Sequence, residues 1–259
     1  MKKKYFFFDI DGTLTDRVTH QIVPSALKTL QLLQQNGHFV AIATGRAHYK
    51  AINFMKEVGL NNMVCNGGHA IVIDGQLVEN KPLDYQKCLS VCYQAEKLGY
   101  GVLVAHGDNQ RVYGKDFKFL KQASFRKEPS IYEIDEKYDY TDHPEIYKMY
   151  ISIPIDQEEK LTLKDMVGHL RFEKEYLMFQ ADAKQAGIKC LMDYLKAPLN
   201  DVVVFGDDDN DIDMFSGPWQ SIAMGNACQH LKEIANEVTE ANIDDGIYKA
   251  CLRHGWIKE

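Results

Sequence analysis

The first quarter of the chain alternates short buried strands with helices, and this pattern restricts the fold more than any other feature. Apolar runs within residues 4–10, 38–44 and 62–65 have the length expected of strands covered on both faces. Between them, residues 24–36 and 47–59 carry apolar residues at helical spacing and end at glycines. Strands that alternate with helices pair in parallel, so this part predicts an α/β sheet.

The middle of the chain has a different character. Residues 69–80 read as a hairpin with Asp74-Gly75 at its turn. Residues 82–182 hold most of the tyrosines and a polar, loop-rich stretch around residues 124–145. The elements expected next are a strand over 146–153, a helix over 156–170 and a strand over 176–180.

After residue 182 the first pattern resumes. We expect a helix over residues 184–195, strands over 201–205 and 221–224, and helices over 227–237 and 244–254. The fold class predicted is therefore α/β. A Rossmann-like parallel-sheet core (residues 1–81 and 183–259) is interrupted by an inserted α+β domain (residues 82–182).

Charge and composition restrict the partners and the compartment. A net charge of −7 and a pI near 5.7 argue against a surface that binds nucleic acid or anionic membranes. No run approaches the roughly 20 apolar residues of a membrane span, and the apolar run after Lys2–Lys4 is too short for a signal peptide. The six cysteines lack a CxxC pair, which favours reduced thiols and a cytoplasmic protein. Whether the chain is a monomer or a homodimer stays open.

Reactive side chains follow the predicted core strands. Ligands of open α/β sheets bind beyond the carboxyl ends of the strands. The predicted core strands end at Asp9 with Asp11, at Thr44-Gly45-Arg46, and at Asp207 with Asn210 and Asp211. Lys184 is the first residue of the helix expected after the insert. Asp9 and Asp11 stand at i and i+2, so an extended strand would project them together. Two adjacent carboxylates need a cation or a shared proton. Hard oxygen ligands of this kind suit Mg²⁺.

These motifs, in this order, resemble those of the haloacid dehalogenase superfamily of phosphotransferases. The similar segments are DIDGTLTD, ATGR, the lysine Lys184 and GDDDNDIDM. An insert of this size between the second and third motifs is similar to the large α+β (C2B-type) cap of the Cof-like sugar-phosphatase branch. The resemblance covers most of the chain and also includes the C-terminal segment where Asp245-Gly246 leads into the last helix.

The resemblance implies a role for each matched position. Asp9 would be the nucleophile that forms an aspartyl-phosphate, and Asp11 would be the general acid and base. Mg²⁺ would be held by the Asp9 carboxylate, the Asp11 main-chain carbonyl and Asp207, with Asp211 nearby or bound through a water. The phosphoryl oxygens would be neutralised by Thr44, the Gly45 amide, Lys184 and Asn210.

Several residues keep two interpretations. Arg46 could contact the substrate or form an interdomain ion pair. Asp208, Asp209 and Asp213 could each take a direct catalytic role. Otherwise Asp208 or Asp209 would cap the following helix, and Asp213 would lie on a solvated helix face, which is the expected place for it. Gln185 follows Lys184 where the family often has glycine, which leaves the local backbone path open. Asn66-Gly67 looks like the family's Asn-Gly pair or a plain turn. The weaker candidates for substrate specificity are His69, His106, Arg111, Lys118, Lys148 and Tyr150.

The predicted function is a Mg²⁺-dependent phosphatase of small phosphorylated metabolites, sugar phosphates foremost. A phosphosugar mutase that uses the same aspartyl-phosphate is the first alternative, and the motifs do not separate the two. A receiver-like signalling domain is the alternative from another class. It is disfavoured because the third strand ends at Cys65-Asn66 with no phospho-accepting aspartate. The physiological substrate is left open.

Overall fold

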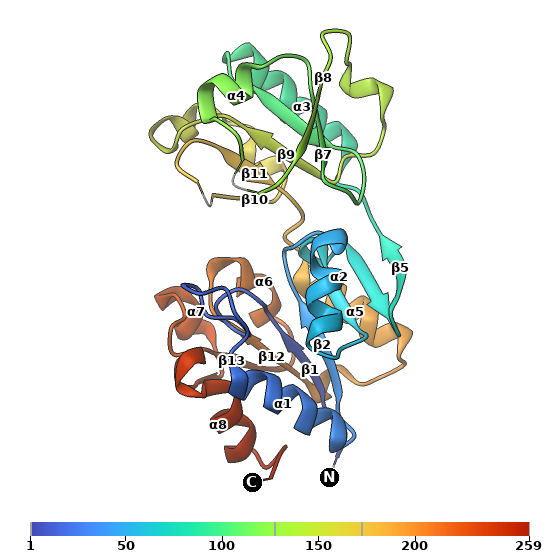
Figure 1. Ribbon diagram of the computed structural model, residues 1–259, viewed down its shortest axis with the longest axis vertical. Coiled ribbons are helices and arrows are strands. Elements are labelled where there is room, and N and C mark those ends of the chain that lie inside the picture. Colours follow the sequence, from blue (N-terminus) through green and yellow to red (C-terminus); the bar gives the residue numbers. More distant parts are fainter. Residues whose placement is uncertain (1, 127, 172, 259) are drawn as a thin grey trace. The chain divides into compact units, whose positions relative to one another are not determined.

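The computed structural model describes residues 2–126, 128–171 and 173–258. The chain separates into two compact units, each drawn in Figure 1. The core unit comprises Met1–Asn80 and Ala183–Glu259, and the inserted unit comprises Lys81–Asp182. The predicted α/β fold class, a mainly parallel sheet with an α+β insertion, is confirmed.

The core unit is built on an eight-stranded sheet in the order β14-β13-β12-β1-β2-β3-β4-β5. All neighbours from β14 to β3 pair in parallel, whereas β4 and β5 form the antiparallel hairpin predicted at Asp74-Gly75. Both turn residues have positive φ angles, as such tight hairpins require. The strands are β1 (Tyr5–Phe8), β2 (Phe39–Ala43), β3 (Met63–Cys65), β4 (Ala70–Ile73), β5 (Gln76–Asn80), β12 (Val202–Gly206), β13 (Gln220–Ala223) and β14 (Glu237–Val238).

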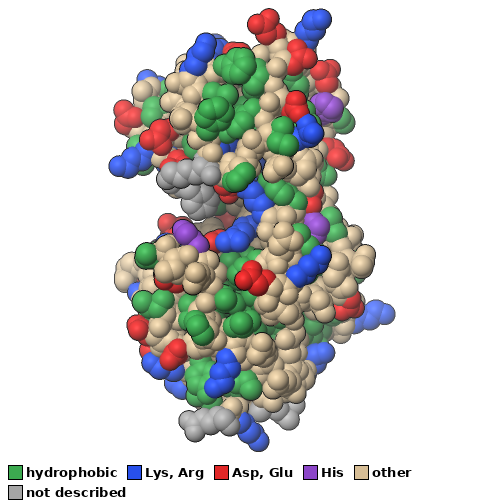
Figure 2. Space-filling model, viewed as in Figure 1, with side chains coloured by type: hydrophobic (Ala, Val, Ile, Leu, Met, Phe, Trp, Pro, Cys, Tyr) green, Lys and Arg blue, Asp and Glu red, His purple; other side chains and the backbone are tan. Residues whose placement is uncertain are grey.

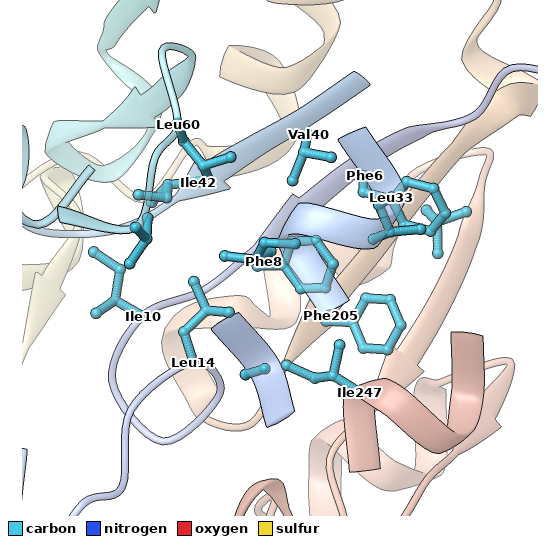
Figure 3. Packing of buried hydrophobic residues seen from close by; sticks show 14 of the residues in the cluster. Phe6, Phe8, Ile10, Leu14, Leu33, Val40, Ile42, Leu60, Phe205 and Ile247 are labelled. Atoms are coloured by element: carbon cyan, nitrogen blue, oxygen red, sulfur yellow. The ribbon is translucent and has the colours of Figure 1, made fainter. Parts of the chain in front are cut away.

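Helices cover both faces of this sheet, which explains the apolar run at its centre (Figure 1). Phe6 and Phe8 point to one face and Phe7 to the other, and all three are fully buried. Figure 3 shows the Phe6 and Phe8 side, where Leu33 and Ile247 complete the packing. The helices are α1 (Pro24–Gln35), α2 (His48–Glu57), α5 (Lys184–Tyr194), α6 (Ile212–Phe215), α7 (Gln229–Ile234) and α8 (Gly246–Arg253).

Local signals in the sequence explain several helix ends. Pro24 occupies the first turn of α1, where its missing N–H costs nothing, and Gly37 takes a positive φ just after the helix. The expected helix over residues 244–254 is α8, which begins at Gly246. The expected helix over 227–237 is shorter, because α7 ends at Ile234 and the chain turns into the edge strand β14.

The inserted unit has a six-stranded sheet in the order β10-β11-β9-β6-β7-β8, antiparallel except for the β7–β8 pair. Asp84 caps the N-terminus of helix α3, because its carboxylate accepts the Lys87 amide. The helix packs its apolar side on one face of the sheet. The elements are α3 (Tyr85–Lys97), β6 (Val102–Ala105), β7 (Arg111–Gly114), α4 (Lys118–Ala123), β8 (Ile131–Ile134), β9 (Lys148–Ile151), β10 (His169–Leu170) and β11 (Leu177–Phe179).

Two expectations for the inserted unit differ from the structure. The helix expected over residues 156–170 is wrong: two 3₁₀ segments (Ile155–Lys160 and Lys164–Met166) and strand β10 lie there. Leu161 and Val167 are nevertheless buried, so the apolar spacing reflects packing under α3 rather than a continuous helix. The loop-rich stretch 124–145 also contains a strand, β8, beside β7.

The remaining features concern surface charge, the hydropathy of the helices and the thiols. Acidic and basic side chains are interspersed on the face shown in Figure 2. None of the helices in the described part of the chain has the length and apolar content of a membrane-spanning segment. All six cysteines are free thiols.

Candidate active site

The carboxyl ends of three parallel strands bring the first polar residues of the motifs to one edge of the core sheet. Asp9 follows β1, Thr44 follows β2 and Asp207 follows β12, and all three are buried. The strands β12, β1 and β2 are direct neighbours in that order. The edge is therefore the place where sequence-distant side chains can cooperate.

Lys184 joins the first and fourth motifs. It is the first residue of α5, it is 1 % exposed, and its Nζ lies 2.7 Å from Asp9 Oδ1 and 2.5 Å from Asp211 Oδ1. Burial opposes the charge on the ammonium, but Asp211 and Asp9 outweigh it and raise the pKa of Lys184. Burial, the charge of Asp211 and that of Asp207 raise the pKa of Asp9 well above its usual range, although Lys184 opposes this.

Asp207 is held from two directions. Thr13 Oγ1 donates to Oδ1 at 2.8 Å, and Arg17 donates to Oδ2 from Nε at 3.0 Å and from Nη2 at 2.6 Å. Burial and the neighbouring Asp211 raise the pKa of Asp207 to about 6 despite these partners. Sequence reasoning missed Arg17; its only signal is that it lies one residue beyond the DIDGTLTD segment.

Gly12 makes this arrangement possible. Its φ is +90°, and a Cβ atom there would lie 2.1 Å from Asp207 Oδ2 and 2.4 Å from Arg17 Nε. The chain turns back after Gly12, since its amide donates to the Thr15 carbonyl at 3.0 Å. Only glycine meets both the backbone and the space requirement at this position.

The expectation that Asp9 and Asp11 project together is wrong. Strand β1 ends at Phe8, so the period of two does not extend through the pair. Asp9 is buried against Lys184, whereas the Asp11 side chain is 53 % exposed and forms a two-pronged ion pair with Arg46. Arg46 donates from Nε at 2.9 Å and from Nη2 at 2.5 Å. Asp9 and Asp11 thus pair with different cations.

A tight turn at Asn66–Gly68 fixes the Thr44–Arg46 loop against the start of α5. The Asn66 amide donates to the Arg46 carbonyl at 2.7 Å, and the Gly67 amide donates to the Thr44 carbonyl at 3.2 Å. The Gly67 carbonyl in turn accepts the Ala183 amide at 2.8 Å. The turn is therefore more than a plain connection, because it sets the second motif relative to Lys184.

Side chains of the fourth motif form hydrogen bonds with the backbone of the same motif. Asp211 Oδ2 accepts the amides of Asp207 and Asp208 at 2.8 and 3.2 Å, and the Asp208 side chain caps the following 3₁₀ turn. Capping by Asp208 confirms one of its two interpretations. Asn210 lies half-buried in this turn.

Asp213 is not a solvated helix-face residue. Its Oδ2 accepts the Gln185 amide at 2.7 Å, which satisfies an N–H in the first turn of α5. This hydrogen bond also defines the backbone path after Lys184, where Gln185 stands in place of glycine. The Asp213 carboxylate thus helps to position Lys184, the lysine of the third motif, through the backbone of the next residue.

Three of these carboxylates could hold a metal ion. Ligand oxygens of Asp9, Asp207 and Asp211 all lie within 4.8 Å of one another, and all three residues are buried. Burial first, and then the charge of Asp211, raise the pKa values of Asp9 and Asp207 despite the partners Lys184 and Arg17, and the cluster has three carboxylates for these two cations. Buried carboxylate oxygens with unneutralised charge fit a hard divalent cation. Asp208, Asp209 and Cys228 form a second, more exposed group.

The weaker specificity candidates are scattered. Lys148 and Tyr150 share strand β9 of the inserted unit and are buried. Arg111 and Lys118 form exposed ion pairs with Glu133 and Asp116. His106 Nε2 lies 2.5 Å from the Tyr138 hydroxyl, and His69 belongs to the core unit.

Comparison with known proteins assigns the family. A family model of haloacid dehalogenase-like hydrolases matches residues 6–251. The chain belongs to this family. The resemblance inferred from the four motifs is thereby confirmed over nearly the whole chain.

Individual relatives agree with this assignment. The chain is 29 % identical to a putative phosphatase, YkrA, of Bacillus subtilis, over all of both chains. A sugar phosphatase of subclass IIB of the superfamily has a TM-score of 0.80 and 25 % identity, covering 98 % of this chain and all of that one. A hypothetical protein of Geobacillus kaustophilus has a TM-score of 0.81 at 26 % identity, covering 99 % and 100 %. The prediction of an enzyme of the phosphatase class is confirmed at this level.

Proposed function

We propose that this protein is a Mg²⁺-dependent phosphatase that hydrolyses small phosphorylated metabolites, sugar phosphates foremost, through an aspartyl-phosphate on Asp9. The observation that carries the proposal is the buried contact of Asp9 with Lys184 beside Asp207 and Asp211. A sugar phosphatase among the structural relatives supports the substrate class.

The first half of the reaction depends on Asp9. An oxygen of its carboxylate attacks phosphorus, and the bond from phosphorus to the ester oxygen breaks. Lys184 holds Asp9 in place, and with Thr44, the Gly45 amide and Asn210 it balances charge on the phosphoryl oxygens. Mg²⁺, held by Asp9, Asp207 and the Asp11 main-chain carbonyl with Asp211 nearby, would neutralise further negative charge at the phosphoryl group.

The proton transfers fall to Asp11. It protonates the leaving oxygen, and then takes a proton from the water that hydrolyses the aspartyl-phosphate. Both oxygens of its carboxylate accept hydrogen bonds from Arg46, so this pair has to open before Asp11 can reach the leaving oxygen. Because both side chains are partly exposed, opening costs little: exposed pairs contribute only about 0–1 kcal/mol.

The test is phosphate release from a panel of phosphorylated metabolites, with Mg²⁺ or with a chelator. Wild type is expected to release phosphate only with Mg²⁺, and Asp9→Asn to lose roughly 10⁴-fold or more in turnover. Asp193→Asn, on the exposed side of α5, is the matched control and should keep wild-type turnover. Release that survives in Asp9→Asn would contradict the proposal. Interconversion of sugar-phosphate isomers without free phosphate would identify a mutase instead.

A further inference from the structure

The turn after strand β1 carries main-chain atoms on which the proposed Mg²⁺ site depends. The fully buried side chains of Ile10 and Leu14 anchor this part of the chain in the core (Figure 3). Within the turn, the Gly12 amide donates to the Thr15 carbonyl at 3.0 Å. The carbonyl and the N–H of a trans peptide point in opposite directions, so this hydrogen bond also sets the direction of the Asp11 carbonyl.

Asn242 holds the acceptor of that hydrogen bond. Its Nδ2 donates to the Thr15 carbonyl at 2.8 Å, and the residue is 6 % exposed. The Thr15 carbonyl already accepts the Gly12 amide, so it does not need a second donor in order to be paired. What the second donor adds is position, because two donors from distant segments restrict where the carbonyl can lie.

Asn226 holds the next peptide of the same turn. Its Nδ2 donates to the Gly12 carbonyl at 2.8 Å. This peptide joins Gly12 to Thr13, whose hydroxyl donates to Asp207 Oδ1 at 2.8 Å. Asn226 is exposed, so water could pair with the Gly12 carbonyl equally well. A side chain differs from water because it also fixes the orientation of the peptide.

The two asparagines form one connected network. Asn226 Oδ1 accepts the Asn242 amide at 2.9 Å. The orientation of the Asn226 side chain is unambiguous, because a backbone N–H only donates and a carbonyl only accepts. The Asn226 segment is itself attached to the fourth motif, since the Cys228 amide donates to the Asp207 carbonyl at 2.9 Å. The network therefore joins the backbones of the first and fourth motifs and uses none of the carboxylate oxygens that could hold a metal.

We propose that Asn226 and Asn242 are positioning residues for the metal site. They hold the turn so that the Asp11 main-chain carbonyl and the Asp207 carboxylate can bind the same cation. This inference rests on the Mg²⁺ site of the proposed function. Ligands whose orientation is fixed in advance by hydrogen bonds bind a metal more tightly. Both asparagines lie outside the four motifs, and they belong to the core unit together with every residue that they hold.

The test is calorimetric titration of the full-length protein with Mg²⁺ alone. Asn226→Ala removes two hydrogen bonds of an exposed side chain, and it should raise the Kd for Mg²⁺ about three- to tenfold, as the loss of one typical hydrogen bond gives. Asn236→Ala is the matched control. Asn236 is also exposed, and its Oδ1 accepts two hydrogen bonds from Ser221 on β13, so its loss should leave the Kd unchanged.

Urea unfolding separates positioning from folding. Asn226→Ala and Asn236→Ala each lose two hydrogen bonds at the surface, so their unfolding midpoints should shift by similar small amounts. Asn242→Ala should also raise the Kd, but it should lose more stability because the residue is buried.

The Kd values decide the inference. An unchanged Kd in Asn226→Ala would overturn it, as would an equal rise in Asn236→Ala or a wild type that binds no Mg²⁺. Because the titration contains no ester, its outcome is independent of catalysis. Failure of the proposed function would appear separately, as Mg²⁺ binding without phosphate release.

Discussion

Lys184 Nζ lies 2.7 Å from Asp9 Oδ1, although 175 residues, including the whole inserted unit, separate the two in sequence. The contact is buried and is shared with Asp211, so one ammonium is surrounded by carboxylates from two motifs. The stability of the core unit and the chemistry of the site are therefore coupled.

Replacement of Lys184 should destabilise the protein strongly. Lys184→Met leaves Asp9 and Asp211 buried without their cation, and removing one partner of a buried pair costs roughly 3–5 kcal/mol. Urea unfolding with chelator present at neutral pH measures this loss. Lys189→Met, on the same helix, removes only a hydrogen bond to Gln185 and should cost less than about 1 kcal/mol. Equal losses in the two variants would contradict the coupling.

Arg17 should compete with a metal for Asp207. It donates twice to Asp207 Oδ2, so Arg17→Gln removes a competing cation and makes the cluster more negative. We expect Mg²⁺ to bind about three- to tenfold more tightly, as a gain of roughly 1 kcal/mol gives. Calorimetric titration of the full chain measures the Kd. Arg253→Gln, which loses its ion pairs with Glu237 and Glu240, serves as control. Unchanged or weaker binding in Arg17→Gln would refute the competition.

Gly12→Ala should damage the site, not merely the fold. Its Cβ would overlap Asp207 Oδ2, and the positive φ adds backbone strain of about 1 kcal/mol. Gly75→Ala is a matched control, because Gly75 has a similar φ of +77° but no atom within 4 Å of the place that an added methyl group would take. We expect comparable strain in both variants. Phosphatase turnover should fall at least about tenfold in Gly12→Ala alone, given how steeply rates depend on placement.

The raised pKa of Asp207 predicts how stability depends on pH without a metal. An unfolded aspartate ionises near pH ~3.9, whereas Asp207 in the folded protein does so at about 6. As the pH rises, Asp207 therefore loses its proton in the unfolded state before it does so in the folded state. The contribution of this proton to the free energy of unfolding is fully present below pH ~4 and is lost as the pH rises through about 6. Its size is about 3 kcal/mol.

The comparison with Asp207→Asn isolates this effect from the other titrating groups. With chelator present, the free energy of unfolding of wild type should fall relative to that of the variant between about pH 4 and 6, and the difference should then stay constant. Urea unfolding over this pH range measures it. If the difference between the two free energies of unfolding does not change with pH, Asp207 has the pKa of an ordinary aspartate and the prediction is wrong.

How far the sequence predicts the site can be judged from single residues. The strand ends at Asp9, Thr44 and Asp207 follow from apolar runs, because parallel strands place their carboxyl ends at one edge. The mutual orientation of Asp9 and Asp11 could not be predicted, because β1 stops at Phe8 and the turn at Gly12 redirects the chain. The ion pairs Arg46–Asp11 and Arg17–Asp207 join loops whose paths no periodicity records.

Local sequence thus determined the order of the elements, the α/β class and the residues available for chemistry, because burial and helical spacing act over a few residues. The tertiary structure decided which cationic side chain pairs with which carboxylate. It also replaced the helix expected over residues 156–170 by 3₁₀ turns under α3, and it brought Arg126 onto the ring of Tyr150. These outcomes depend on contacts between distant segments, whose energies are settled only when the whole core packs.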